Sequence, residues 1–481
     1  MGSKYAVNTN HLFLQLPDET LGTYNLHDTH ETAKLVGPLT KELKDNGQWE
    51  HYLAQVEPLQ YAVLAMQRRG LLVHKGRLGN LKSSLAKELM ETDETVLLAD
   101  ASGELRRPTA KYPNSLGSTK KVGEYLYGQL GLKPLKKTEK GFNSTDQEAL
   151  FRLLKGLRKK DAGARPILEA LFHRSRLKTL LQRYMVFDVD EDSRVRAQVK
   201  MYGTKTMRFA YARPALQQFP KELWPVFVAE PGKVFLSVDY KQLEAKLLGY
   251  LASDYPSIDA FEHGEDIHAH NAMDLFGLPV GGWEALEPAQ REAHRIYSKA
   301  FLYGISYGGA AESMKLRTYC PCPKCVGKVP PALAVKRTEV KVAERRWFQK
   351  HPAVRRFQKQ LVRTVTQNHC YESPLFPGAK RYITSPYTKD LEREIKNLPM
   401  QYGAALLMNE RQRRLHQELE APIVLQRHDE FLLEVPEGEV ERWAKDVREI
   451  MEAPIEGLSG VSFGVDVEAG SSWGNLKSLK F

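Results

Sequence analysis

The sequence predicts an α+β fold, with helices through its first half and two separate strand signals after them. The run VFLSV at 234–238 is rich in β-branched and aromatic residues and predicts a buried strand. VLQRHDEFLLEV at 424–435 has apolar runs on both sides of a polar tip, which predicts a hairpin. Helical apolar spacing dominates the chain up to residue 185. The chain therefore combines many helices with strands that include a hairpin, as α+β proteins do.

Length and composition restrict the class of protein. The 481 residues suffice for about two to four domains with a large core. Neither a run of about 18 apolar residues nor an apolar signal core is present, so a cytoplasmic protein without a membrane span is expected. A net charge of +11 suits a polyanionic partner without establishing one. Four cysteines in so long a chain are no disulfide framework, which favours a reducing compartment.

The elements before the first strand follow from apolar spacing and stop signals. Helices are expected at 24–46, 57–73 with a stop at Gly70, 76–96, 119–130 and 164–185. Residues 194–202 are strand-like, and the basic, turn-rich segment 132–145 is either a tip that touches phosphates or a solvated loop. Residues 206–220 combine Arg, aromatics and two amides, which can reach base edges and phosphates together.

Asp239 follows the predicted strand directly, where a helical pattern begins at Leu243. A strand end fixes the backbone and leaves a carboxylate free to hold a cation. The alternative is that Asp239 only caps the following helix, a position that also suits Asp.

A helix predicted at 290–308 carries Arg295, Lys299, Tyr303 and Tyr307 at four-residue spacing, so they share one face. Two cations followed by two aromatics could bind phosphates and lie against a sugar or base. The alternative is a solvated basic face that passes into a packed aromatic one.

The predicted hairpin places His428, Asp429 and Glu430 at its turn. Adjacent carboxylates there repel each other unless a cation is near. On neighbouring strands, Asp239 and Asp429 would supply the two anionic ligands of a paired-magnesium site for phosphoryl transfer.

Three motifs together resemble the family A DNA polymerases, the group of bacterial DNA polymerase I and many phage replicases. They are DYKQLEAKLLGYLASD at 239–254, RIYSKAFLYGISYG at 295–308 and QRHDEFLLEV at 426–435. Secondary matches lie at 118–138, 206–208, 216–220, 264–279 and 397–405. The resemblance extends over roughly residues 20–475 and includes the order of the motifs.

The resemblance implies a right-hand polymerase with an antiparallel palm sheet and helical fingers and thumb, copying a DNA template from a primer with dNTPs. The implied domains are an exonuclease-domain remnant (1–55), thumb and connecting helices (56–193), palm (194–254), fingers with a Cys-containing insertion (255–385) and palm again (386–481). A phage-type replicative enzyme acting as a monomer is expected. The rival functions are a single-subunit RNA polymerase and a non-catalytic DNA-binding protein.

The resemblance also implies residue roles. Asp239 and Asp429 would hold two Mg²⁺ ions together with the Tyr240 carbonyl, while Arg295 and Lys299 grip the triphosphate and Lys299 protonates the leaving group. The other implied nucleotide-binding residues are Glu244, which would exclude a ribose 2′-hydroxyl, and Tyr303, Tyr307, Gln242 and His268. The implied DNA-binding residues are Arg208, Gln217, Arg393, Asn397, Gln401 and His428.

Two departures from the family pattern carry expectations. Tyr303 stands where many members have Phe, which predicts weak discrimination against dideoxynucleotides. Tyr24 and Asp28 fit only the closing element of an exonuclease domain, so no 3′ to 5′ exonuclease is expected in this chain alone. A separately encoded exonuclease or a processivity factor would then be a further partner.

A cysteine cluster lies in the apparent fingers insertion. Cys320, Cys322 and Cys325, with Cys370, could bind zinc, but the first spacing is tighter than usual. Free thiols are the favoured alternative.

Overall fold

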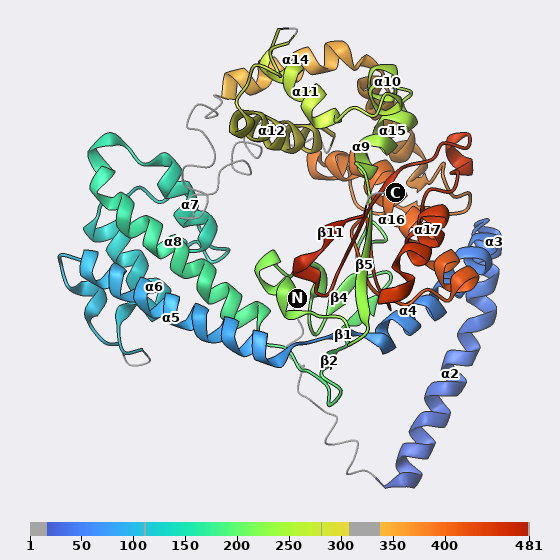
Figure 1. Ribbon diagram of the computed structural model, residues 1–481, viewed down its shortest axis with the longest axis horizontal. Helices are drawn as coiled ribbons and strands as arrows, with labels where there is room; N and C mark the ends of the chain where they lie inside the picture. The colour runs from blue at the N-terminus through green and yellow to red at the C-terminus, as the bar shows by residue number, and fades with distance from the viewer. Residues whose placement is uncertain (1–16, 110–111, 280, 307–336, 480–481) are drawn as a thin grey trace.

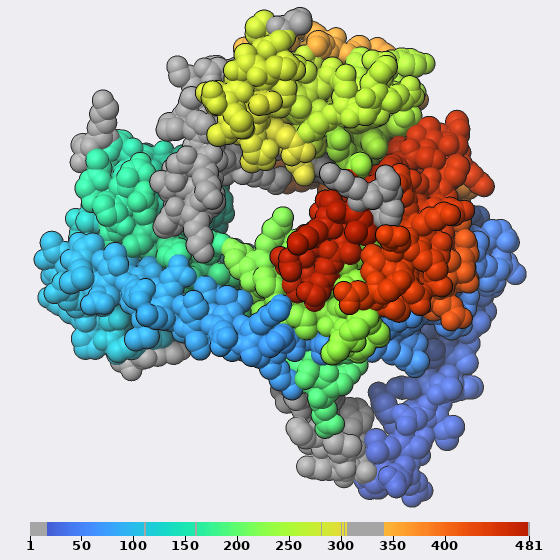
Figure 2. Space-filling view, viewed as in Figure 1, coloured from blue at the N-terminus to red at the C-terminus, as the bar shows by residue number. Residues whose placement is uncertain are grey.

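The computed structural model describes residues 17–479, apart from 110–111, 280 and 307–336. A central body built on an antiparallel sheet carries one helical lobe at its side and a second above it (Figure 1). Figure 2 shows an opening between these three parts. The central sheet is antiparallel and helices make up the two lobes, which confirms the α+β class. Within the described ranges, no helix is both long enough and apolar enough to cross a bilayer.

The central sheet has five strands in the order β11-β10-β5-β9-β8, with every neighbouring pair antiparallel. Its strands are β5 (Lys233–Tyr240), β8 (Ile423–Arg427), β9 (Glu430–Pro436), β10 (Val465–Gly470) and β11 (Lys477–Ser478). The predicted strand at 234–238 and the predicted hairpin are therefore both confirmed. They also lie side by side, because β5 pairs directly with β9.

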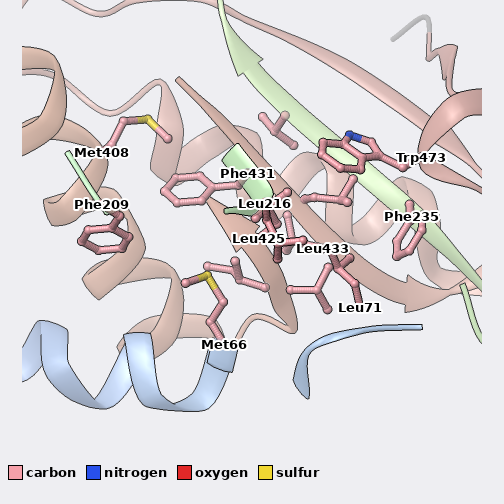
Figure 3. Close-up of a cluster of buried hydrophobic side chains, with 14 of the residues drawn as sticks. Met66, Leu71, Phe209, Leu216, Phe235, Met408, Leu425, Phe431, Leu433 and Trp473 are labelled. Atoms are coloured by element: carbon pink, nitrogen blue, oxygen red, sulfur yellow. The ribbon is translucent and has the colours of Figure 1, made fainter. Parts of the chain in front are cut away.

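Three helices pack against this sheet and close the main core: α4 (Glu57–Arg69), α16 (Lys389–Leu419) and α17 (Val440–Met451). Figure 3 shows Met66 of α4 and Met408 of α16 beside Phe431 of β9. Phe431 is fully buried, and burying a side chain of that size contributes about 1.5–3 kcal/mol. Helix α4 ends at the predicted stop, where Gly70 has φ 61°.

The side lobe has its own apolar core, which includes Leu126, Leu154 and Leu168. Its helices are α5 (Lys75–Ala99), α6 (Thr119–Gly123), α7 (Gln147–Gly156) and α8 (Arg165–Thr179). Both α6 and α8 continue as π-helical turns, at Glu124–Gln129 and Leu180–Tyr184, so the predicted helices at 119–130 and 164–185 are found nearly in full.

The upper lobe is helical and packs around Phe301, Trp347 and Val354. Its helices are α9 (Leu243–Ala252), α10 (Tyr255–Glu262), α11 (Ile267–Phe276), α12 (Pro288–Ser306), α14 (Arg337–Lys350) and α15 (Pro352–Asn368). Helix α9 follows β5 directly, so this lobe is joined to the end of the central strand.

The remaining elements are the first helices of the described chain and three two-stranded sheets. Helix α2 (Asp18–Asp45) extends away from the body and has no buried residue, and α3 (Trp49–His51) lies at its base (Figure 1). Three two-stranded sheets pair β1 (Leu71–Leu72) with β2 (Arg194–Val195), β3 (Gln198–Lys200) with β4 (Ala210–Ala212) and β6 (Cys370–Glu372) with β7 (Lys380–Tyr382). The strand-like stretch 194–202 forms two short strands, β2 and β3, which pair with different partners, β1 and β4.

Candidate active site

Two carboxylates from distant parts of the chain meet at one end of the central sheet. Asp239 is the next-to-last residue of β5, and Asp429 lies in the turn between β8 and β9. The Tyr240 backbone N–H donates to the Asp429 carbonyl oxygen at 3.1 Å, which fixes the turn against the end of β5. The sheet thus brings together the two residues that the sequence predicts as metal ligands.

The two carboxylates destabilise each other's charge in this structure. Partial burial raises the pKa of Asp239 well above its usual value, and the negative charges of Asp429 and Glu430 raise it further. Burial also raises the pKa of Asp429, although the cations Arg208 and Lys299 oppose that shift. The pair therefore titrates as one unit, and a divalent cation between the two groups would remove the repulsion.

Asp239 does not cap the following helix, so that alternative is wrong. Helix α9 begins at Leu243, and the preceding residue is Gln242, whose φ of 58° is left-handed. Tyr240 turns its ring away from the carboxylates: only 2% of it is exposed, and its hydroxyl donates to the Met451 carbonyl. Only the Tyr240 backbone is thus available beside the carboxylates.

The prediction that Glu430 belongs to the turn is wrong, because it is already the first residue of β9. Its buried carboxylate accepts a hydrogen bond from Ser237 Oγ at 2.7 Å and pairs with Arg427 at 3.0 Å. Glu430 therefore has partners of its own and influences Asp239 only through its charge.

Helix α12, which carries the predicted cationic face, lies in the upper lobe (Figure 1), and the charge of its Lys299 acts on Asp429. Arg295 pairs with Asp266, whereas the Lys299 side chain is exposed. Nearby His268 has only 2% of its surface exposed, and burial together with Lys299 and Arg295 outweighs Asp266 and lowers its pKa to about 4. The helix is described through Ser306, and the Tyr303 side chain and Tyr307 lie outside the described residues.

Glu244 and Arg208 form an ion pair close to Asp429. Glu244 lies in the first turn of α9, with 13% of its side chain exposed. His428 precedes Asp429 with φ 57°, and burial and the Arg208 charge lower its pKa. A predicted sugar-selecting residue and two predicted DNA-binding residues thus adjoin the carboxylate pair.

The other predicted DNA-binding residues lie on two elements beside this group. Arg393, Asn397 and Gln401 recur at four-residue spacing on α16, and Gln217 lies in the turn Leu216–Gln218. Among the described residues, neither Gln217 Oε1 nor Asn397 Oδ1 has a hydrogen-bond partner, although both atoms are buried. Unsatisfied buried acceptors are uncommon in folded proteins and require a partner such as a water, an ion or a ligand. Arg393 is exposed and pairs with Asp390.

The side lobe contains a hollow of about 1120 Å³ that sequence reasoning missed. It is lined by α6, α8 and the segment 138–146, with the cations Lys120, Arg174, Lys178 and Arg183 among its residues. Burial and the Arg174 charge lower the pKa of Lys178. The four-residue spacing of Arg174 and Lys178 indicates that they share one helix face. Only the packing of the lobe shows that this face borders a hollow.

The carboxylate pair and the cysteines are the two candidate metal sites. Among the described residues there is no group of three or more His, Cys, Asp and Glu side chains arranged to hold a metal. Two carboxylates nevertheless fit Mg²⁺, which binds through one or two carboxylates plus waters and substrate phosphates. For the zinc prediction, Cys320, Cys322 and Cys325 lie outside the described residues, and Cys370 is a free thiol at the start of β6.

The central sheet, which carries the carboxylate pair, lies between two helical lobes, one of which contains the cationic helix α12. This arrangement is a right-hand polymerase fold. The profile described as DNA polymerase family A matches residues 83–475. The chain therefore belongs to DNA polymerase family A.

Relatives and solved structures agree with this assignment. The chain is 26% identical to DNA polymerase I of Pseudomonas aeruginosa over 96% of its own length and 48% of that protein. It is 28% identical to the thermostable DNA polymerase I of Thermus thermophilus, over 94% of this chain and 52% of that protein. The chain thus spans about half the length of the curated relatives it matches. A solved structure of the Pol1 polymerase domain from M. smegmatis, with DNA primer-template and dNTP, superimposes with a TM-score of 0.75 at 25% identity, over 92% of this chain and 74% of that one.

Proposed function

We propose that this chain is a template-directed DNA polymerase that extends a DNA primer with dNTPs by two-metal-ion nucleotidyl transfer. The observation that carries the proposal is the meeting of Asp239 and Asp429 on neighbouring strands, held by the Tyr240 N–H to Asp429 hydrogen bond. Family membership and the likeness to a primer-template complex support it.

In the proposed mechanism, the carboxylates of the sheet bind metal ions and the cations of α12 bind the triphosphate. Asp239, Asp429 and the Tyr240 carbonyl would hold two Mg²⁺ ions, which lower the pKa of the primer 3′-hydroxyl and neutralise the departing pyrophosphate. Arg295 and Lys299 bind the triphosphate from α12, and the exposed Lys299 donates a proton to the leaving group. Buried His268 stays neutral at pH 7, so it offers a hydrogen bond rather than a charge.

DNA would run along the sheet and into the side lobe. Gln217 and Asn397 would reach the minor groove near Arg208, Gln401 and His428, with their side-chain amide N–H groups donating to the acceptors that correct base pairs share. The cations that line the side-lobe hollow would contact the backbone phosphates of the upstream DNA. In this assignment the side lobe is the thumb, the sheet is the palm and the upper lobe is the fingers.

The finer expectations belong to this proposal. They are a phage replicative role in the host cytoplasm, action as a monomer, and no proofreading by this chain alone. The exposure of Tyr24 and Asp28 on α2, a helix with no buried residue, supports the last point, because an enclosed site is not built around them within the described residues.

Primer extension on matched and mismatched ends, with dNTP, ddNTP or NTP, tests the function. We expect extension with dNTP, weak discrimination against ddNTP because of the Tyr303 hydroxyl, rejection of NTP, and no degradation of a mispaired primer. Equal use of NTP would favour the RNA polymerase alternative. DNA binding without any extension would favour a non-catalytic DNA-binding protein.

Glu244→Ala is expected to admit ribonucleotides. Removing this side chain opens space at the start of α9 and deletes the Arg208 partner, so the ratio of kcat/KM for dNTP over NTP should fall by about 100-fold. Competing single-nucleotide incorporations measure this ratio. Glu262→Ala, an exposed residue of α10, is the matched control and should leave the ratio unchanged. An unchanged ratio for Glu244→Ala would remove Glu244 from sugar selection.

A further inference from the structure

Arg295, the proposed triphosphate ligand, already has an acidic partner within the protein. Its Nε donates to an Asp266 carboxylate oxygen, and Asp266 lies at the N-terminus of α11, outside the three sequence motifs. The other Asp266 oxygen accepts the His268 backbone N–H at 2.9 Å. Although partial burial opposes it, the hydrogen bonds from Arg295 and from His268 N–H lower the pKa of Asp266. Asp266 is thus an ionised side chain held at both oxygens.

The start of α11 is in turn tied to the end of β5. The Ile267 backbone N–H donates to Gln242 Oε1 at 3.2 Å, and Gln242 is the left-handed residue between β5 and α9. Two contacts therefore connect the strand that carries Asp239 to the helix that carries Arg295. They run from Gln242 to the first turn of α11, and from Asp266 to α12.

Arg295 contacts Asp266 through its Nε atom, and this determines how the contact affects the guanidinium group. A guanidinium presents its N–H groups in a rigid fork, so an acceptor at Nε fixes the plane of the whole group. The two terminal nitrogens, which suit bidentate binding of phosphate oxygens, are left for another acceptor. The Arg295 side chain is 39% exposed, so it is accessible from the opening. An Asp266 that held Arg295 away from the nucleotide would instead have to engage those terminal nitrogens.

We propose that Asp266 is a positioning residue for the incoming nucleotide. It orients the Arg295 guanidinium through Nε so that the terminal nitrogens meet the triphosphate, at a place set by the end of β5. This proposal rests on the proposed polymerase function and adds a residue to its nucleotide site.

Asp266→Asn tests the proposal with little change to α11, because Asn is an equally good N-cap. Loss of a charge-assisted hydrogen bond should raise KM for dNTP about tenfold in single-nucleotide incorporation, with kcat within about twofold. The Kd for primer-template DNA should stay the same. Asp192→Asn is the matched control, since Asp192 also pairs with an arginine and accepts a backbone N–H, in a loop outside the nucleotide site.

A double-mutant cycle separates positioning from a general structural role. Arg295→Lys keeps the charge and lacks the Nε donor, so adding Asp266→Asn to it should raise KM no further. A tenfold rise in that background as well, an unchanged KM in Asp266→Asn alone, or a lowered KM would each overturn the proposal. These results differ from failure of the proposed function, in which the unaltered chain itself would extend no primer.

Discussion

Asp429→Asn is expected to lower the rate of primer extension by at least about 10³-fold, a loss of about 4 kcal/mol of transition-state stabilisation. The substitution removes one of the two anionic ligands and keeps the side-chain shape. The turn is held through the Asp429 backbone carbonyl, which accepts the Tyr240 N–H and is unaffected. Single-turnover extension measures the rate, and a DNA-binding titration should show an unchanged Kd.

The same variant should be more stable than the unaltered chain when no metal is present. Because the folded-state pKa of Asp429 is raised, its ionised form costs stability at pH above its unfolded pKa, and protonation relieves that cost as the pH falls. At pH 7 in EDTA the melting temperature of Asp429→Asn should therefore rise, and the stabilisation by added Mg²⁺ should disappear.

A suitable control for this experiment is Asp466→Asn. Asp466 lies opposite Asp239 in the sheet register, but its side chain is 66% exposed and pairs with Lys241 at 3.0 Å. This variant should keep its activity and its response to Mg²⁺. Normal extension by Asp429→Asn would contradict the proposed mechanism, whatever its stability.

Arg194→Met is expected to destabilise the fold by about 3–5 kcal/mol, because it leaves a buried carboxylate without its cation. Arg194 Nη2 contacts Glu230 at 2.6 Å and Glu434 at 2.7 Å, and only 6% of the Glu434 side chain is exposed. Its Nη1 donates to the Gly70 carbonyl at 3.0 Å, where α4 ends. This arginine therefore joins β2, α4 and β9 at the point where the side lobe meets the sheet.

Urea unfolding followed by circular dichroism measures this loss of stability. Arg196→Met provides the comparison, since the carboxylates that Arg196 pairs with, Asp190 and Asp192, are 52% and 49% exposed and its Nε donates to the Arg68 carbonyl at 2.7 Å, so that no buried carboxylate loses its cation and the cost should be about 1 kcal/mol or less. Adding Glu434→Gln to Arg194→Met should recover part of the loss. A cost for Arg194→Met no larger than that for Arg196→Met would show that Glu434 tolerates burial without a cation.

Local patterns in the chain were enough to predict most elements. Apolar spacing located α4, α8 and α12 closely, and Gly70 marked the end of α4, since helix formation depends on neighbours within four residues. The division of the strand-like stretch 194–202 into two strands could not be predicted in this way. Its residues favour extension, but which partner each half pairs with is decided by segments far along the chain.

By itself, the sequence determined which residues are predicted to carry the chemistry. Residue patterns with periods of two to four predict the positions of the key side chains: Asp239 at a strand end, Asp429 in a hairpin turn and Arg295 and Lys299 on one helix face. The motif resemblance implied their roles. Only the tertiary structure decided which groups meet. Three contacts join segments that are distant in the chain: β5 pairs with β9, Arg194 contacts Glu434, and Asp266 accepts a hydrogen bond from Arg295. Such contacts depend on packing and burial, which no local pattern encodes.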